Sequence, residues 1–201
     1  MNDRSMSAEI AATAARLVVE EGLEYGPAKR RAARELDRRG RAARDMPSND
    51  ELEDEVRAYL ALFCADTHPA ELAALRALAA RWMQRLTEFR PHLGGAVWRG
   101  TATRRNDIHI TLYCDDPKSC EISLIDRGVD YRVGCAPGPR GVAVDVLSLS
   151  DDCPELGERV GVHLTVLDHD DLRGALKPDA RGRTERGDFA ALQQLISQES
   201  P

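Results

Sequence analysis

The chain has 201 residues, with 34 acidic against 28 basic side chains and a formal net charge of −6. Its hydrophobic share of 42% supports a folded core, and its aromatic share of 4% argues against a sheet of stacked rings that reads single-stranded nucleic acid. No apolar run approaches the roughly 20 residues that a membrane-spanning helix needs, so we expect no membrane contact.

The N-terminal sequence and the cysteine spacing indicate the cellular compartment and the redox state of the thiols. Residues 1–10 have neither the basic start nor the apolar stretch of a secretory signal peptide. The five cysteines are odd in number and lack CxxC spacing. We therefore expect a cytoplasmic protein with reduced thiols, rather than a disulfide scaffold or a zinc finger. The excess of Arg over Lys, with abundant Ala, is typical of bacterial chains from GC-rich genomes.

The first 90 residues predict helices. Apolar residues recur at helical spacing over 8–21, and a second helix is expected over 27–36. A capping-box sequence at 48–51 opens a third helix that continues to about residue 63. Residues 70–89 predict a long amphipathic helix, whose leucines and tryptophan fit either a core stripe or a dimer seam.

A basic segment runs from Lys29 to Arg44, with eight basic and two acidic side chains in an acidic protein. Arg-rich helices bind phosphates electrostatically, and residues 9–36 have the proportions of a helix-turn-helix. The alternative is a solvated surface that pairs with the acidic residues at 50–55. The side chains assigned to a nucleic-acid interface are Lys29, Arg30, Arg31, Arg34, Arg38, Arg39 and Arg41.

The second half of the chain changes to the period of strands. We expect an α+β protein, with a helical region over 1–90 packed on a C-terminal mixed β-sheet over 91–201. Strands are predicted over 96–98, 107–114, 129–133, 141–149 and 160–167, a short helix over 117–127, and a final helix over 188–197 behind a polar loop.

Several common motifs are missing from the sequence. It contains no GxxxxGK[ST] phosphate loop, no GxGxxG, no HExxH and no GxSxG. P-loop nucleotide hydrolysis, dinucleotide redox chemistry, zincin proteolysis and the common hydrolase elbow therefore lose their main sequence support.

A subtler pattern joins Gly100-Thr101 to Asp107-Ile108-His109 at the start of the next strand. A Gly followed by a small hydroxyl residue lets backbone N–H groups and a hydroxyl approach a triphosphate closely. Two carboxylates two residues apart on one strand share a face, where divalent ions can bridge them to phosphates.

This arrangement resembles the nucleotidyltransferase superfamily, with its polymerase-beta-like fold, over residues 93–149. The resemblance implies a nucleotidyltransferase-like core that transfers a nucleotidyl group from a nucleoside triphosphate to a protein, RNA or small-molecule acceptor. It also implies a third carboxylate on a later strand, where Asp145 stands. The implied catalytic and metal-holding residues are Asp107, His109 and Asp145, and the implied triphosphate cradle is Gly100, Thr101, Arg104 and Arg105.

The sequence departs from the family pattern at its second carboxylate, which is His109. The implied cofactor is a divalent metal, Mg or Mn, and an imidazole suits zinc or manganese better than magnesium. The alternative function is a non-catalytic nucleic-acid or partner-binding protein on a degenerate scaffold of this kind.

The same residues also have purely structural interpretations. Asp107 would then open a strand, His109 would be a hydrogen-bonded strand residue, and Asp145 would face solvent. The acidic cluster at 168–171 is expected to cap a helix rather than to bind a metal.

Overall fold

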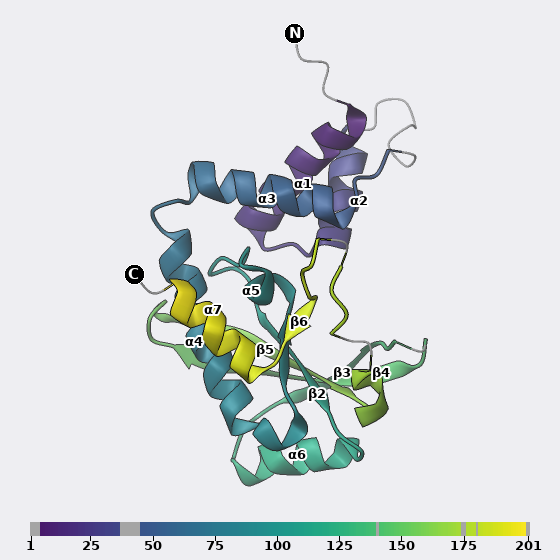
Figure 1. The fold of residues 1–201 in the computed structure, drawn as a ribbon, viewed down its shortest axis with the longest axis vertical. Coiled ribbons are helices and arrows are strands. Elements are labelled where there is room, and N and C mark those ends of the chain that lie inside the picture. Colours follow the sequence, from purple (N-terminus) through teal and green to yellow (C-terminus); the bar gives the residue numbers. More distant parts are fainter. Residues whose placement is uncertain (1–4, 37–44, 140, 174–175, 180, 200–201) are drawn as a thin grey trace. The chain divides into compact units, whose positions relative to one another are not determined.

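The computed structural model of the chain describes residues 5–36, 45–139, 141–173, 176–179 and 181–199. It has the mixed α+β character that the sequence predicts, with helices in the N-terminal part and a mixed sheet in the C-terminal part (Figure 1).

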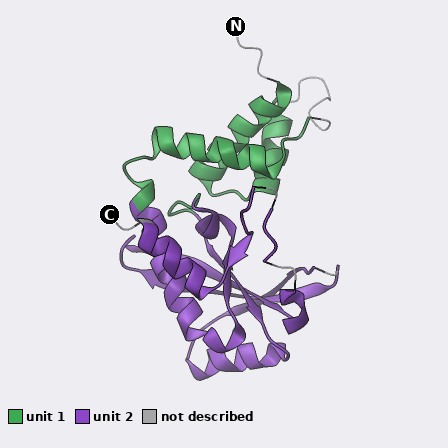
Figure 2. Cartoon of the chain, viewed as in Figure 1, with its two compact units in different colours: residues 1–69, 101–105 green, residues 70–100, 106–201 purple. Residues whose placement is uncertain are grey.

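The chain divides into two compact units (Figure 2). Unit 1 comprises residues 1–69 and 101–105, and unit 2 comprises residues 70–100 and 106–201. The long helix after residue 68 thus belongs almost entirely with the sheet, and the division falls earlier than the expected one after residue 90.

Unit 1 is built from three helices: α1 (Met6–Glu21), α2 (Tyr25–Leu36) and α3 (Asn49–Phe63). The helix α1 packs against both of the others. These elements confirm the three helices predicted for this part of the chain. The core of the unit is formed by buried side chains from all three helices, among them Ile10, Leu17, Val18, Ala28, Ala32, Leu52, Val56 and Leu60.

The predicted capping box at the start of α3 is confirmed. The Ser48 Oγ atom accepts from the backbone N–H of Glu51 at 3.1 Å, and the backbone N–H of Ser48 donates to Glu51 Oε2 at 2.7 Å. Two backbone donors that the helix itself leaves unpaired are therefore satisfied.

Unit 2 opens with α4 (His68–Arg85), which supplies the apolar stripe expected over 70–89. Trp82 is 2% exposed, and its Nε1–H donates to Asp151 Oδ2 at 2.9 Å, so this stripe is core. The guanidinium of Arg85 lies 5.1 Å from the Trp82 ring centroid and also pairs with Asp151.

The sheet of unit 2 has six strands in the order β3-β4-β5-β2-β1-β6. Neighbouring strands β2 and β5 are parallel, and all other neighbours are antiparallel. Its strands are β1 (His92–Gly94), β2 (Ile108–Tyr113), β3 (Arg132–Pro137), β4 (Ala143–Cys153), β5 (Glu158–Leu167) and β6 (Arg186–Gly187). The remaining elements of the unit are the 3-10 turns η2 (Thr87–Phe89) and η3 (His169–Leu172) and the helices α5 (Gly95–Arg99), α6 (Pro117–Asp126) and α7 (Phe189–Glu199).

The two faces of the sheet differ in chemistry. One face is apolar and buried. Asp151 lies on this face, because every second residue of β4 projects to the same side, and it accepts the hydrogen bond from Trp82. The helix α4 therefore covers this face. The buried residues of this face include Leu93, Ile108, Ile110, Leu147, Leu149, Val162 and Leu164. The opposite face carries half-buried polar side chains in its central strands, and we call it the polar face.

The strand predicted over 96–98 is wrong, because this segment forms the short helix α5. An apolar run of three residues has no period that separates a strand from a helix. Glycines with positive φ stand at both ends, Gly95 at +67° and Gly100 at +76°. The buried Arg76 of α4 then satisfies α5 carbonyls by donating to Val97 O at 3.1 Å and to Trp98 O at 3.3 Å.

The other elements predicted for unit 2 are present, but the strand expected over 129–133 shares only residues 132–133 with β3, and the end of β4 also differs. The strand expected over 129–133 begins only at Arg132, and its partner β4 continues to Cys153 rather than ending at 149. The polar loop expected before the last helix contains the short strand β6.

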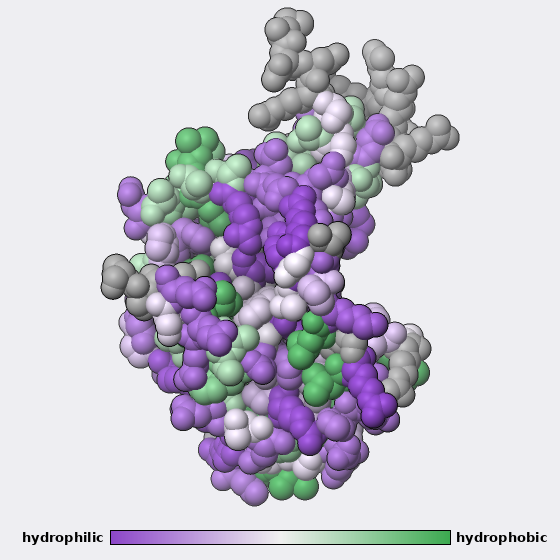
Figure 3. Space-filling model, viewed as in Figure 1, coloured by the Kyte–Doolittle hydropathy of each residue, from purple (hydrophilic) through white to green (hydrophobic). Residues whose placement is uncertain are grey.

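On the face drawn in Figure 3, hydrophilic residues predominate and hydrophobic ones lie in small groups. The most exposed large apolar side chains of unit 1 are Leu62, at 72%, and Phe63, at 64%, at the end of α3.

Candidate functional site

One residue from each of the six strands lines up in a single row across the sheet. The strand registers pair these residues in sequence, and neighbouring strands lie about 4.8 Å apart. Residues that pair directly across strands project to the same face, here the polar face. This row, which we call the polar row, consists of Arg132, Ser148, His163, His109, Gly94 and Arg186.

Asp107, the residue just before β2, makes contacts with the polar row. Its Oδ1 atom accepts from the backbone N–H of Gly161 at 3.2 Å, and its Oδ2 atom lies 3.0 Å from His163 Nε2. The other ring nitrogen of His163, Nδ1, lies 2.9 Å from Ser148 Oγ. Asp107, His163 and Ser148 thus form one continuous chain of hydrogen bonds, which we call the relay.

The position of Asp107 depends on glycine at 161. A Cβ at this position would lie 2.5 Å from Asp107 Oδ1, a separation that real Cβ atoms do not show. The absence of a side chain at Gly161 therefore lets the carboxylate approach the β5 backbone and accept its N–H.

The His109 and His163 rings stack face to face, with centroids 5.0 Å apart and planes inclined by 21°. The two residues pair directly across the parallel strands β2 and β5. Gly95 lies beside the His109 ring, and a Cβ there would be in ordinary van der Waals contact with it, 3.5 Å from Cδ2.

The charge state of Asp107 follows from these contacts. The hydrogen bond from His163 is the main cause that lowers the pKa of Asp107 below its ordinary value. Burial opposes this effect, and the charge of His163, the Gly161 N–H and the charge of His109 support it. Asp107 is therefore ionised at neutral pH.

When His163 is neutral, the donor inventory of each group sets the direction of both hydrogen bonds in the relay. An ionised carboxylate only accepts, so His163 Nε2 donates to Asp107. In a neutral imidazole the other nitrogen has no proton, so Nδ1 accepts and the Ser148 hydroxyl donates to it.

Arg186 forms the end of the polar row on the short strand β6. One guanidinium nitrogen donates to Thr111 Oγ1 at 3.3 Å and to Tyr113 OH at 3.0 Å. The Tyr113 ring in turn meets His92 edge-on, with centroids 5.2 Å apart. These contacts hold a cation over β2, on the polar face.

The structure brings two of the three predicted catalytic residues together. Asp107 and His109 share the polar face at the start of β2. Asp145 lies elsewhere. It projects to the same side of β4 as Leu147 and Leu149, which is the side opposite Ser148. Its side chain is exposed, as the structural interpretation of this residue expects.

The predicted metal ligands Asp107, His109 and Asp145 therefore do not meet at one point. Both oxygens of Asp107 already accept hydrogen bonds, Oδ1 from the Gly161 N–H and Oδ2 from His163. Within the part of the chain that the structure describes, no group of three or more His, Cys, Asp and Glu side chains has a metal-binding arrangement. The donor set therefore does not fit the two-metal site of the resemblance.

The predicted triphosphate cradle is divided between the two units. Gly100 ends α5 in unit 2, whereas Thr101, Arg104 and Arg105 belong to unit 1. Thr101 is buried, and its Oγ1 atom has no hydrogen-bond partner among the described residues. Arg104 and Arg105 are exposed in a turn.

The predicted nucleic-acid interface is described in part, since Arg38, Arg39 and Arg41 lie outside the described residues. Lys29 donates to Pro47 O at 3.0 Å and Asn49 Oδ1 at 2.8 Å, and so ties α2 to the start of α3.

The arginines of α2 fall into two kinds. Arg31 pairs with Glu21 at 2.5 Å and Glu35 at 3.0 Å. In contrast, Arg30 and Arg34 are exposed one helical turn apart, and neither makes an ion pair or hydrogen bond with a residue that the structure describes.

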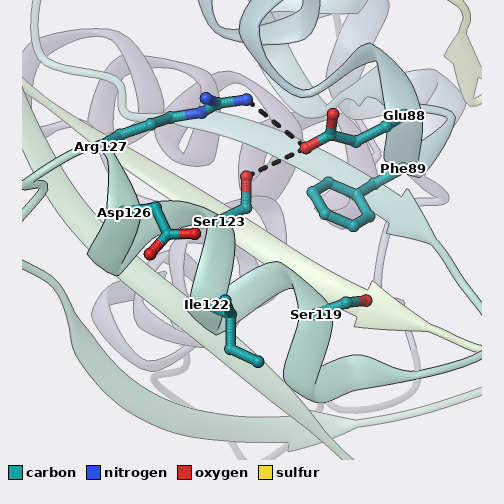
Figure 4. A pocket seen from close by; sticks show the side chains of 7 residues that line it. All are labelled: Glu88, Phe89, Ser119, Ile122, Ser123, Asp126 and Arg127. Carbon is teal, nitrogen blue, oxygen red and sulfur yellow. Dashed lines mark hydrogen bonds and ion pairs between the residues drawn. The ribbon is translucent and has the colours of Figure 1, made fainter.

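Two hollows lie away from the relay. Figure 4 shows the first, of about 430 Å³, where Glu88 Oε1 accepts from Ser123 Oγ at 3.0 Å and from Arg127 at 3.4 Å. Three of its polar side chains, Glu88, Ser123 and Arg127, thus pair with one another. The second, of about 320 Å³, is lined by Pro117, Pro139, Val142, Ala143, Val144, Asp145, Val166, Asp168 and Asp171.

The acidic cluster at 168–171 has the capping role that was expected. The Asp168 carboxylate accepts from the backbone N–H of Asp170 at 2.8 Å at the start of η3.

Sequence reasoning missed His163, Ser148, Gly161 and Arg186. A signal for His163 is present: the segments DIHITLY and VGVHLTV each carry one histidine in an alternating apolar strand. If the two strands are neighbours, both histidines can meet on one face. Ser148 and Arg186 have no comparable signal, because only the strand register brings them into the row.

None of the family models, curated proteins or solved structures compared with this chain matches it. Among the described residues, no helix is long and apolar enough to cross a lipid bilayer.

Proposed function

We propose that the protein is nucleotidyltransferase-like, that it acts in the cytoplasm, and that the polar face of its sheet binds a nucleoside triphosphate. The observation that carries the proposal is the meeting of Asp107 and His109 with His163 and Ser148 on this face. Asp107 and His109 are the residues on which the resemblance to nucleotidyltransferases rests.

The polar row has the chemistry that nucleotidyl transfer requires. Arg132 and Arg186 stand at its two ends, and guanidinium groups bind phosphate oxygens through paired N–H donors. Between them, His163 Nδ1 has a lone pair that can take the proton of an attacking hydroxyl. Phosphoryl transfer depends mainly on positioning and on charge stabilisation, both of which such a row can provide.

In the proposed reaction an acceptor hydroxyl attacks the α-phosphorus of the triphosphate. The new oxygen–phosphorus bond forms as the bond to the β-phosphate breaks, and pyrophosphate leaves with the electron pair. The hydroxyl proton passes to an imidazole of the row. The divalent metal that the resemblance implies stays a prediction, and the binding experiment includes it as a variable.

The test is binding of each nucleoside triphosphate, with and without Mg²⁺, Mn²⁺ or Zn²⁺, followed by the rise in melting temperature. A ligand that binds only the folded state raises the melting temperature. We expect a rise that Arg132→Gln together with Arg186→Gln abolishes, because these guanidinium groups bind the phosphates, and that Asp145→Asn retains, since Asp145 lies on the other face. Absence of a rise at millimolar triphosphate, or equal loss in both variants, would contradict the proposal.

A second candidate function is contact with nucleic acid through unit 1. It is favoured by Arg30 and Arg34, two exposed cations one turn apart on α2, while Lys29 and Arg31 are engaged in holding the unit together. We expect Arg30→Ser with Arg34→Ser to weaken RNA or DNA binding and to reduce its salt dependence. A matched control replaces Arg16 and Arg57 by Ser, which removes the same charge from α1 and α3. Binding that is absent, insensitive to salt or equally weakened in both variants would exclude this function.

A further inference from the structure

We propose that Ser148 is a nucleophile, that His163 is its general base, and that the group it attacks is a phosphoryl centre. The nature of that electrophile rests on the proposed nucleotide site, whereas the activation of Ser148 rests on the relay alone. In the proposed function Ser148 is thus the first acceptor of the nucleotidyl group.

The relay meets the geometric conditions for an activated serine. Ser148 Oγ lies 2.9 Å from His163 Nδ1, within the distance at which a base can take the hydroxyl proton. Because Asp107 fixes the proton of His163 on Nε2, the nitrogen that faces Ser148 is the basic one. Asp107 acts through His163 and is therefore a positioning residue.

The parts of the relay are held by independent contacts. The Gly161 N–H holds the carboxylate at 3.2 Å, and the His109 ring stacks on His163. Ser148 and His163 stand opposite each other in the antiparallel pair of β4 and β5, so the backbone register sets their separation. The relay therefore needs no large rearrangement before reaction.

The order of contacts differs from that of the serine proteases, in which the serine meets Nε2 and the aspartate meets Nδ1. Here Ser148 meets Nδ1 and Asp107 meets Nε2. Either ring nitrogen of a neutral imidazole can serve as the base once the other carries the proton.

The surroundings of Ser148 favour an anionic electrophile. Arg132 stands directly opposite Ser148 on the exposed strand β3. The register puts the Arg132 side chain on the face of Ser148, and a guanidinium on that face can attract phosphate oxygens and stabilise the charge that they gain in the transition state.

Transfer to Ser148 forms one oxygen–phosphorus bond and breaks another. Ser148 Oγ forms a bond to the α-phosphorus of a nucleoside triphosphate, its proton moves to His163 Nδ1, and pyrophosphate leaves with the electron pair of the broken bond. The product is a serine nucleotidyl phosphodiester.

The test uses the full chain and a fluorophosphonate probe, which reports an activated serine without a nucleotide. Ser148 Oγ displaces fluoride from phosphorus, and peptide mapping by mass spectrometry locates the adduct. We expect the label on Ser148, its loss in Ser148→Ala, and a rate at least about 100-fold lower in His163→Gln. Ser150→Ala is the matched control: Ser150 lies two residues further along the same strand, is exposed, and faces Gly161 rather than a histidine.

Asp107→Asn separates positioning from a general loss of structure. We expect the maximal labelling rate to fall at least about tenfold while the probe concentration for half-maximal rate stays unchanged. If Ser148→Ala fails to fold, Ser148→Cys provides the second measurement: its alkylation by iodoacetamide should be faster than that of Ser150→Cys, and His163→Gln should remove the difference.

Three labelling results would overturn the inference. An unlabelled Ser148 in the folded chain, equal labelling of Ser150, or an unchanged rate in His163→Gln would each exclude an activated Ser148. A parallel incubation with α-³²P-labelled triphosphates tests the electrophile. Radioactivity on Ser148 supports both proposals, whereas a fluorophosphonate label without any radioactive transfer retains the nucleophile and excludes the nucleotide.

Discussion

Gly161 and Asp107 lie so close that position 161 has no room for a side chain. The backbone N–H of Gly161 donates to Asp107 Oδ1 at 3.2 Å, and a Cβ on Gly161 would lie 2.5 Å from the same oxygen. This contact fixes the carboxylate on which the orientation of His163 depends.

Replacement of this glycine should disconnect the relay with little loss of stability. In Gly161→Ala the carboxylate of Asp107 must move, and its side chain is 51% exposed and free to swing outward. We expect the free energy of unfolding to fall by about 1 kcal/mol or less, while labelling of Ser148 falls as in Asp107→Asn. Chemical denaturation and probe kinetics measure the two effects.

The control for this substitution is Gly134→Ala on β3. A Cβ there would meet its nearest neighbour, Val146 O, at 3.8 Å, an ordinary contact. Labelling of Ser148 should be unchanged in this variant. A Gly161→Ala protein that labels like the wild type would show that the Gly161 contact does not position Asp107.

The Asp107–His163 contact predicts a dependence of stability on pH. The hydrogen bond from His163 lowers the pKa of Asp107 in the folded state, so the unfolded state binds the proton more tightly. The resulting stabilisation is fully present above the unfolded value of about 3.9 and is lost as the pH falls through the lower folded value.

Urea denaturation at a series of pH values measures this effect. The stability difference between the wild type and Asp107→Asn should be constant above about pH 5 and should shrink below about pH 4. A difference that does not change with pH would mean that folding leaves the pKa of Asp107 unshifted.

Much of the fold could be predicted from the sequence because its signals are local. The capping box at Ser48 and Glu51 and the alternation of residues 160–167 depend on neighbours a few residues apart. The strand predicted over residues 96–98 was wrong, because three apolar residues are too few to show the spacing of a strand or a helix. Their structure depends on contacts from Arg76 in another helix.

The candidate site could be predicted only in part, because some of its residues are brought together by strand pairing and not by local sequence signals. Asp107 and His109 sit two residues apart on one strand, so the sequence alone places them on one face. Ser148 and His163 enter the site through the pairing of β4 with β5, which depends on the order of strands in the sheet. Asp145 was assigned by analogy of position, and the alternation of β4 turns it to the opposite face.

The capping box of α3 predicts a measurable contribution to the stability of unit 1. Ser48→Ala removes the acceptor of the Glu51 N–H and should lower the stability of this unit by about 1 kcal/mol. Hydrogen exchange of the amides in α3, followed by mass spectrometry, measures the change in that unit alone. Ser48→Asp keeps a good N-cap and should restore the wild-type exchange rate. Unchanged exchange in Ser48→Ala would contradict the prediction.

The cysteines should differ strongly in reactivity. Burial raises the pKa of the Cys114, Cys120 and Cys153 thiols, which leaves little thiolate at neutral pH. Cys135 is exposed on β3. Brief alkylation by iodoacetamide with peptide mapping should therefore modify Cys135 first and the three buried thiols only in denaturant. Early modification of Cys120, whose Sγ atom lies 3.4 Å from that of Cys114, would contradict the buried arrangement.

The imidazole signals of the five histidines provide the most direct test of nucleotide binding at the polar face. We would titrate the protein with a non-hydrolysable nucleoside triphosphate and follow the ring resonances by NMR, with assignments from single His→Gln variants. We expect the signals of His109 and His163 to move together and saturate, those of His68 and His169 to stay in place, and Arg132→Gln together with Arg186→Gln to abolish the change. Stationary signals for His109 and His163 at saturating nucleotide, or shifts confined to His68 and His169, would contradict it.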